Sequence, residues 1–182
     1  MSSTPQEAHY TYEDYKNFPD ELRCEIIDGR VHDMTPAPST KHQRVTGEIY
    51  RLIRNHLTAG HPYRVYIAPT DVVLADDQVV QPDVFVVCER SKVRDAAIFG
   101  APDVVFEVLS PNTETMDRGR KMEIYEQFGV KEYHLIHVDL EFVEKYILSA
   151  GSYGRPRIYR GEQTFTIDAV GLEIMAADLF AE

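Results

Sequence analysis

The sequence of 182 residues has only two cysteines, Cys24 and Cys88, and no apolar run longer than a β-strand. Two cysteines are too few for a disulfide framework, and no Cys/His cluster has the spacing of a zinc site. We expect both to be buried free thiols, the common state of cysteine. A membrane span needs about 20 apolar residues in a row, so none is predicted. Residues 1–8 are polar and lack a signal-peptide core, which predicts a cytoplasmic protein.

Positive charge is also scarce, because the formal net charge is −11 at pH 7. This balance argues against simple binding to a polyanion. It leaves room for nucleic-acid chemistry only where a local basic edge or bound cations offset the overall sign. The sequence also has no Gly-rich phosphate loop and no nucleophile elbow. His134 and His137 are three residues apart on an expected strand, so they point to opposite faces and make a poor metal pair.

The composition that remains, 43% hydrophobic and 27% charged, is ordinary for a globular domain. We predict a single domain over residues 1–182, with a loose leader at 1–9 and a C-terminal appendage at 150–182. Turn and capping signals predict a short helix capped by Thr11 and a hairpin that turns at Asp28–Gly29. Apolar residues at helical spacing predict helices at 41–57 and 115–128. Short apolar runs predict strands at 63–67, 71–74, 79–87, 104–109, 133–138 and 142–148. Residues 90–99 are expected to form a short helix or loop, and 151–154 a loop. This order predicts an α/β fold, a mixed sheet flanked by helices with an N-terminal hairpin extension.

Two of the expected strands carry one carboxylate each where an apolar residue would be expected. Asp83 lies near the start of the 79–87 run, and Glu107 lies inside 104–109. A lone ionised carboxylate in such a strand is unfavourable unless a positive charge compensates it. Lys121 lies on the inward stripe of the next helix, at helical spacing from Ile124 and Tyr125. The pattern therefore predicts that the two carboxylates share a cation near this lysine.

Oxygen ligands of this kind suit Mg²⁺ or Mn²⁺, which bind a scissile phosphate and support attack by water. The backbone carbonyl of Val108 is a candidate further ligand, and Glu25 a candidate further carboxylate. His42, at the start of the 41–57 helix, extends the inward stripe of that helix toward the same region.

Structural alternatives remain open for each of these residues. Asp83 can be a strand-end residue, and Glu107 can form a buried ion pair with Lys121 alone. His42 can make a polar contact at a helix end. Glu25 can form a cross-strand ion pair with Arg23.

An ordered set of short motifs over residues 12–148 resembles the Uma family, whose members are described as restriction endonucleases and belong to the PD-(D/E)XK nuclease superfamily. The motifs are Glu25–Gly29, His42–Gln43, Asp71–Leu74, Gln81–Val84, Glu107–Pro111, Asp117, Lys121, Tyr125 and Gly129–Tyr133. Each motif is weak alone, and the ordered set is specific. The resemblance implies a restriction-endonuclease-like fold.

The resemblance also implies roles for individual residues. Pro82–Asp83 would be the "PD" of the superfamily motif and Glu107 its second acid. Leu109 stands where the motif lysine belongs, and Lys121 looks like the migrated replacement. Glu25 and His42 would line the same pocket. His137 stands where relatives tend to carry an aspartate, and we assign it no role.

From these observations we predict a Mg²⁺- or Mn²⁺-dependent endonuclease acting on DNA. Asp83, Glu107, Val108 and Glu25 would hold the metal, while Lys121 and His42 would act on water or phosphate. Cutting both strands of a duplex predicts a homodimer. Two alternatives stay open: a catalytically silent nuclease fold that binds nucleic acid or a protein partner, and a hydrolase of small nucleotides or RNA.

Overall fold

The computed structural model describes residues 8–19, 21–34, 37–111 and 113–181, so most of the predicted leader lies outside the described residues. Its helical segments are α1 (Tyr12–Tyr15), α2 (Thr40–His56), η1 (Arg90–Lys92), α3 (Glu114–Met116), the π-helical segment η2 (Asp117–Lys121), α4 (Met122–Gln127) and η3 (Ala176–Leu179). Among the described residues, no helix is long and apolar enough to cross a membrane.

The larger of two main sheets is seven-stranded, with the order β11-β10-β9-β8-β6-β3 and β12 paired to β10. Its strands are β3 (Arg64–Ile67), β6 (Val84–Val87), β8 (Val104–Leu109), β9 (Glu132–His137), β10 (Phe142–Ser149), β11 (Ser152–Tyr153) and β12 (Arg157–Arg160). Strands β8 and β9 pair in parallel, and the other pairs are antiparallel. This is the predicted mixed sheet.

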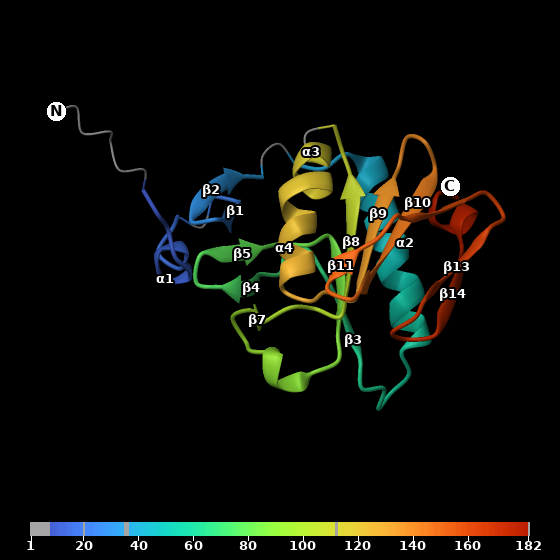
Figure 1. The fold of residues 1–182 in the computed structure, drawn as a ribbon, viewed down its shortest axis with the longest axis horizontal. Helices are drawn as coiled ribbons and strands as arrows, with labels where there is room; N and C mark the ends of the chain where they lie inside the picture. Colours follow the sequence, from blue (N-terminus) through green and yellow to red (C-terminus); the bar gives the residue numbers. More distant parts are fainter. Residues whose placement is uncertain (1–7, 20, 35–36, 112, 182) are drawn as a thin grey trace.

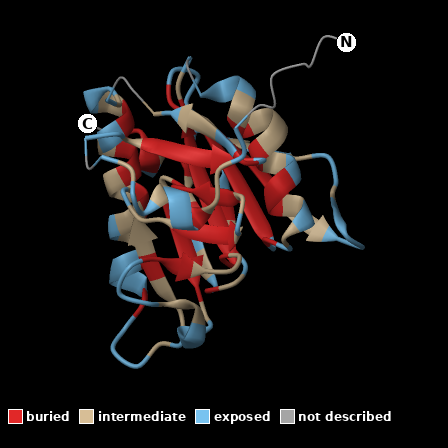
Figure 2. Ribbon diagram, turned by 90° about the vertical axis from the view of Figure 1, so that its left-hand side faces the viewer, coloured by how far each residue is buried: buried red, intermediate tan, exposed pale blue. Residues whose placement is uncertain are grey.

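Helices cover both faces of this sheet, with α3, η2 and α4 on one side and α2 on the other (Figure 1). Side chains alternate along β6, so that Val84 and Val86 pack in the cluster with α2, while Phe85 and Val87 pack in the cluster with α4. The strands at the centre of the sheet are therefore buried on both faces, as Figure 2 shows.

The second sheet is five-stranded, with the order β2-β1-β5-β4-β7. Its strands are β1 (Cys24–Ile27), β2 (Arg30–Asp33), β4 (Val72–Ala75), β5 (Gln78–Val80) and β7 (Ile98–Phe99). The predicted hairpin turn has positive φ at Asp28 (54°) and Gly29 (70°), which suits a tight turn between twisted strands. The hairpin is thus one edge of a sheet.

The single strand predicted at 79–87 is wrong. The chain forms β5 and β6 in different sheets, with a break at Gln81–Asp83. Pro82 has no N–H to give to a ladder, and the N–H of Gln81 is bonded to the Glu25 carboxylate at 2.8 Å. The apolar pattern continues across the break because both strands are buried.

Smaller differences concern the C-terminal half and the thiols. The predicted helix at 115–128 is present, with its Gly129 cap at φ 80°, but it contains the π-helical segment η2. The predicted loop at 151–154 forms β11, which pairs with β10. Cys24 is buried as expected, whereas Cys88 is only half-buried.

The C-terminal residues pack against the larger sheet. The hairpin of β13 (Thr164–Ile167) and β14 (Leu172–Met175) leads into η3. Phe165, Ile167 and Ile174 belong to the same buried cluster as the inward face of α2. In Figure 1 this hairpin lies beside α2, at the side of the molecule opposite β1 and β2.

Candidate active site

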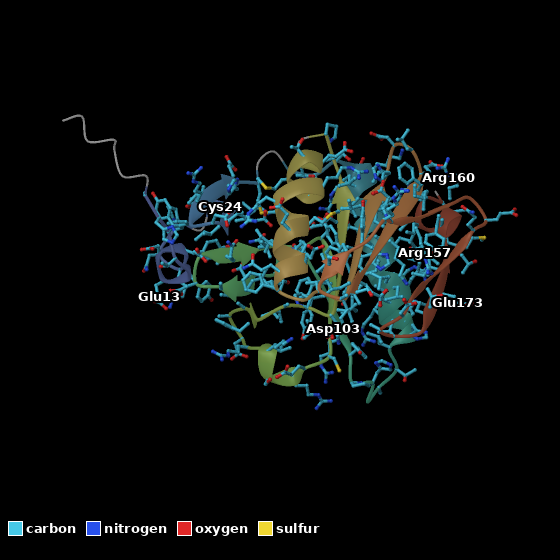
Figure 3. All side chains as sticks on the ribbon, in the orientation of Figure 1. Glu13, Cys24, Asp103, Arg157, Arg160 and Glu173 are labelled. Atoms are coloured by element: carbon cyan, nitrogen blue, oxygen red, sulfur yellow. The ribbon has the colours of Figure 1, made fainter. Side chains whose placement is uncertain are left out.

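A cavity of about 520 Å³ opens where β8 ends, between the two main sheets. Its walls come from the hairpin β1–β2, the start of α2, the break at Gln81–Asp83, the loop after β8, and α3 with η2. Two residues labelled in Figure 3 help to locate the cavity. Asp103 immediately precedes β8, at the end of the strand away from the cavity. Cys24 lies in β1, next to the cavity residue Glu25.

Glu107 is the buried acid at the centre of this region, with 3% of its surface exposed. Its Oε1 accepts a hydrogen bond of 2.9 Å from the Tyr125 hydroxyl and lies 2.6 Å from Lys121 Nζ. Its Oε2 accepts a longer bond of 3.4 Å from the backbone N–H of Asp83. Strand β8 is buried along its whole length, so Glu107 is held in place from both sheet and helix.

Lys121 comes from the π-helical segment and places its ammonium among three carboxylates. Besides Glu107, Nζ lies 3.2 Å from Glu25 Oε1 and 3.4 Å from Asp117 Oδ1. The lysine is buried, as are all three acids. Asp117 is four residues before Lys121, so one helical face supplies both groups. From the sequence, Asp117 appears only within the family motif, and this spacing is the signal that could have assigned it to the site.

Asp83 and His42 form a second pair that lines the same cavity. Asp83 Oδ2 accepts a 2.8 Å hydrogen bond from the backbone N–H of Val108 and lies 3.3 Å from His42 Nε2. The ladder between β6 and β8 ends at Phe106. The backbone of Val108 is therefore available to Asp83 on this side.

The buried charges shift the pKa values of the site strongly. Burial raises the pKa of Glu107 well above its usual value, and nearby carboxylates add to this against the attraction of Lys121. Burial also raises the pKa of Asp117. For Lys121, burial opposes charge, but the surrounding carboxylates raise its pKa well above the usual value. These shifts share one cause beside burial, because three carboxylates are crowded around a single ammonium.

His42 belongs to the same electrostatic system. Burial disfavours its charged form, but hydrogen bonds to Asp83 and to the backbone of Val108 outweigh burial and raise the pKa of the imidazole. Thr46 supports the ring, because its hydroxyl lies 3.3 Å from His42 Nδ1. The histidine is thus oriented toward Asp83 from within α2.

The donor set fits a hard divalent cation, because carboxylates and a backbone carbonyl are the ligands that Mg²⁺ and Mn²⁺ prefer. A further positive charge would also relieve the excess of carboxylates. Over the described ranges, however, no three Asp, Glu, His or Cys side chains are grouped closely enough to enclose an ion by themselves. An ion at Asp83 and Glu107 would therefore keep several water ligands.

Five of the six site residues predicted from the sequence line this cavity, and the sixth, Val108, is not among its lining residues. Glu25, His42, Asp83, Glu107 and Lys121 all line it. Glu25 does not pair with Arg23; it bonds to Gln81 N–H and Lys121 instead. His137 lies elsewhere, with its Nε2 2.6 Å from an Arg118 nitrogen and 3.4 Å from Glu144.

Two further cavity residues, Arg23 and Gln81, were not predicted as site residues from the sequence. Arg23 precedes β1, and the sequence suggested it only as an ion-pair partner of Glu25. Gln81 was noticed only as a member of a motif. Both become visible when the two sheets are assembled, since each lies far along the chain from Glu107.

Comparison with known proteins agrees with this architecture. A curated relative, an uncharacterised protein from Synechocystis sp., is 31% identical over 104 residues. That match covers 56% of this chain and 53% of the relative, so about half of the relative's length is spanned. The crystal structure of a "putative nuclease belonging to DUF820" from Anabaena variabilis superposes with a TM-score of 0.77 at 20% identity, covering 93% of this chain and 97% of that one.

The fold is therefore the predicted one, an α/β nuclease-like fold. A family model described as "Uma2: Putative restriction endonuclease" matches residues 10–177. That range includes every residue placed around the cavity above. By this match over nearly its whole length, the chain belongs to the Uma2 family of restriction-endonuclease-like proteins.

Proposed function

We propose that this protein is a Mg²⁺- or Mn²⁺-dependent endonuclease that hydrolyses phosphodiester bonds in DNA. The observation that carries the proposal is the convergence of Asp83, Glu107 and Lys121 on one cavity from three separate elements. An excess of buried carboxylates around one ammonium is the charge distribution that a divalent cation would complete. Membership of the Uma2 family supports the nuclease class. The metal and the DNA substrate are proposed from the chemistry of the cavity residues.

Asp83 and Glu107 would hold the ion with the carbonyl of Val108, and Glu25 would be a further carboxylate. A bound divalent ion would supply Lewis acidity toward a phosphoryl oxygen and lower the pKa of bound water. Lys121 would position the attacking water, or stabilise charge that develops on phosphate. His42, which also lines the cavity, would contact phosphate or solvent.

Duplex DNA as substrate implies two cuts, so we also propose a homodimer as the working unit. Two copies would present two cavities to the two strands. Size-exclusion chromatography with light scattering, with and without duplex DNA, tests this directly; a monomer in both conditions contradicts it.

The decisive experiment is plasmid cleavage with Mn²⁺ by the wild type, Glu107→Gln and Lys121→Met. We expect both variants to lose cleavage, because Gln keeps the shape but not the charge of the ligand, and Met keeps the volume but not the ammonium. Glu123→Gln and Lys16→Met are matched controls on exposed side chains away from the cavity. Cleavage that persists in both site variants excludes this site.

One observation favours a catalytically silent protein instead. The net charge of −11 opposes approach to a polyanion. Calorimetric titration with Mn²⁺ separates the two functions, because a silent binding module requires no affinity for the ion at these carboxylates. A substrate panel with DNA, RNA and small nucleotides then distinguishes an endonuclease from the hydrolase of small nucleotides or RNA.

A further inference from the structure

Three buried side-chain polar atoms lack a hydrogen-bond partner among the described residues: Arg23 Nε, Gln81 Oε1 and His134 Nδ1. Two of these three residues, Arg23 and Gln81, line the candidate active-site cavity. Buried polar groups are nearly always paired, so an unpaired one needs an explanation. A ligand in the cavity is a direct explanation.

Gln81 is the more informative of the two, because its amide can adopt only one orientation. Its Nε2 donates to Asp71 Oδ1 at 2.8 Å and to the Tyr15 hydroxyl oxygen at 3.1 Å. Tyr15 in turn donates its proton to the same Asp71 oxygen at 2.8 Å. An ionised carboxylate only accepts, so the NH₂ group must face Asp71. The carbonyl oxygen Oε1 is therefore fixed as the unpaired atom.

The surroundings of Gln81 indicate which ligand would meet this oxygen. Gln81 is 7% exposed, so its unpaired carbonyl is withdrawn from the outer surface of the molecule. The backbone N–H of Gln81 is bonded to Glu25, and Asp83 follows two residues later. Gln81 thus belongs to the break that brings the carboxylates together and lines the cavity there, where a ligand that carries donor hydrogens and positive charge is favoured.

We propose that Gln81 Oε1 accepts a hydrogen bond from a water ligand of the divalent ion held at Asp83 and Glu107. The inference rests on the proposed function and deepens it. The described side chains are too few to enclose an ion, so much of its shell is water. Water polarised by a cation is a strong donor and is held best by a fixed neutral or anionic acceptor. Tyr15 and Asp71 are then positioning residues that fix the amide.

The test is calorimetric titration of the intact protein with Mn²⁺ in the absence of DNA, so that binding is measured apart from cleavage. We expect Gln81→Met to weaken Mn²⁺ binding by about 10-fold or more, the range typical of lost outer-shell contacts. Gln81→Asn, which stays polar but withdraws the carbonyl, is expected to weaken binding in the same direction. It provides the measurement should the Met variant fold poorly.

Gln78→Met is the matched control. Gln78 is equally buried, at 6% exposure, but pairs with Asp28 outside the cavity. We expect its Mn²⁺ affinity to equal that of the wild type. If the wild type binds Mn²⁺ and folded Gln81 variants bind it equally well, this inference is overturned while the proposed function stands. If the wild type binds no Mn²⁺, both are overturned.

Discussion

At the scale of single residues, the protein concentrates unfavourable electrostatics in one place. Lys121 is the one ammonium within 4.0 Å of Glu25, Glu107 and Asp117 in the described part of the chain. Buried charges are tolerated when they are paired, and removal of one partner leaves the other uncompensated. The same arrangement that would serve chemistry therefore also controls stability.

Lys121→Met should consequently destabilise the fold. We expect the free energy of unfolding, measured by urea denaturation in chelator, to fall by about 3–5 kcal/mol, as when a buried pair is broken. The double variant with Glu107→Gln should recover part of this loss, since one uncompensated acid is removed. Wild-type stability in Lys121→Met would show that the carboxylates do not depend on the ammonium.

A second prediction at the scale of single residues concerns Arg23. Its Nε is buried without a partner and the residue lines the cavity, so we expect the guanidinium to contact a phosphate of bound DNA. Arg23→Met should weaken DNA binding and reduce the slope of log affinity against log salt by about 1. Arg157→Met is the control, because Arg157 lies on β12, outside the cavity lining (Figure 3). Equal salt slopes for the two variants would contradict a phosphate contact.

At the scale of elements, most of the fold follows from local sequence. The spacing of Val45, Ile49 and Ile53 predicts α2, and Asp28–Gly29 predicts the first hairpin. The break between β5 and β6 and the π-helical segment were not predictable in the same way. At the break the N–H of Gln81 bonds to Glu25, and at η2 the carbonyl of Asp117 accepts from the Tyr133 hydroxyl. An apolar pattern carries no record of such long-range contacts.

The same distinction applies to the residues of the candidate site: some could be identified from local sequence and others could not. The lone acids in apolar strands, Asp83 and Glu107, and the inward Lys121 could be identified because each is anomalous in its own element. Gln81 could not, since the direction of its amide is set by Tyr15 and Asp71, which come from other parts of the chain. A residue that is anomalous within its own helix or strand can be identified from the sequence. A residue whose role depends on how the two sheets pack together cannot.

The attachment of the C-terminal hairpin is an element-scale feature with a pH dependence. Glu132 in β9 accepts hydrogen bonds from the backbone N–H groups of Asp168 and Ala169 and lies 3.3 Å from Lys145 Nζ. Burial alone would raise its pKa, but His134, the Ala169 N–H and Lys145 outweigh burial and lower the pKa to about 2. Glu132 is therefore more acidic in the folded chain than in the unfolded one.

Because the pKa of Glu132 is lower in the folded chain than in the unfolded chain, its contribution to stability depends on pH. A lowered pKa contributes stability that is complete above the unfolded value of 4.5 and is lost as the pH falls toward about 2. We expect Glu132→Gln to reduce the free energy of unfolding by about 3 kcal/mol at pH 7, from the size of that shift. The gap to the wild type should narrow below about pH 4.5. Denaturant unfolding at several pH values measures this, and a gap independent of pH would contradict it.

At the scale of the whole molecule, the charge and the proposed substrate oppose each other. The net charge is −11, and the cavity adds a local excess of carboxylates at the point where phosphate would bind. Electrostatic attraction normally provides much of the affinity for DNA. The overall field of this protein would repel DNA, so a bound cation would have to supply local attraction as well as the proposed chemistry.

This conflict predicts opposite effects of one variant in two conditions. In chelator, Asp83→Asn with Glu107→Gln should bind duplex DNA more tightly than the wild type, because two negative charges leave the cavity. With Mn²⁺ the order should reverse, since only the wild type can hold the cation that attracts phosphate. Fluorescence anisotropy at constant ionic strength measures both. A double substitution of two exposed acids, Glu123→Gln with Glu13→Gln, gives the same change in net charge outside the cavity. If these controls shift binding as much as the site variant does, the field of the whole molecule and not the cavity governs association.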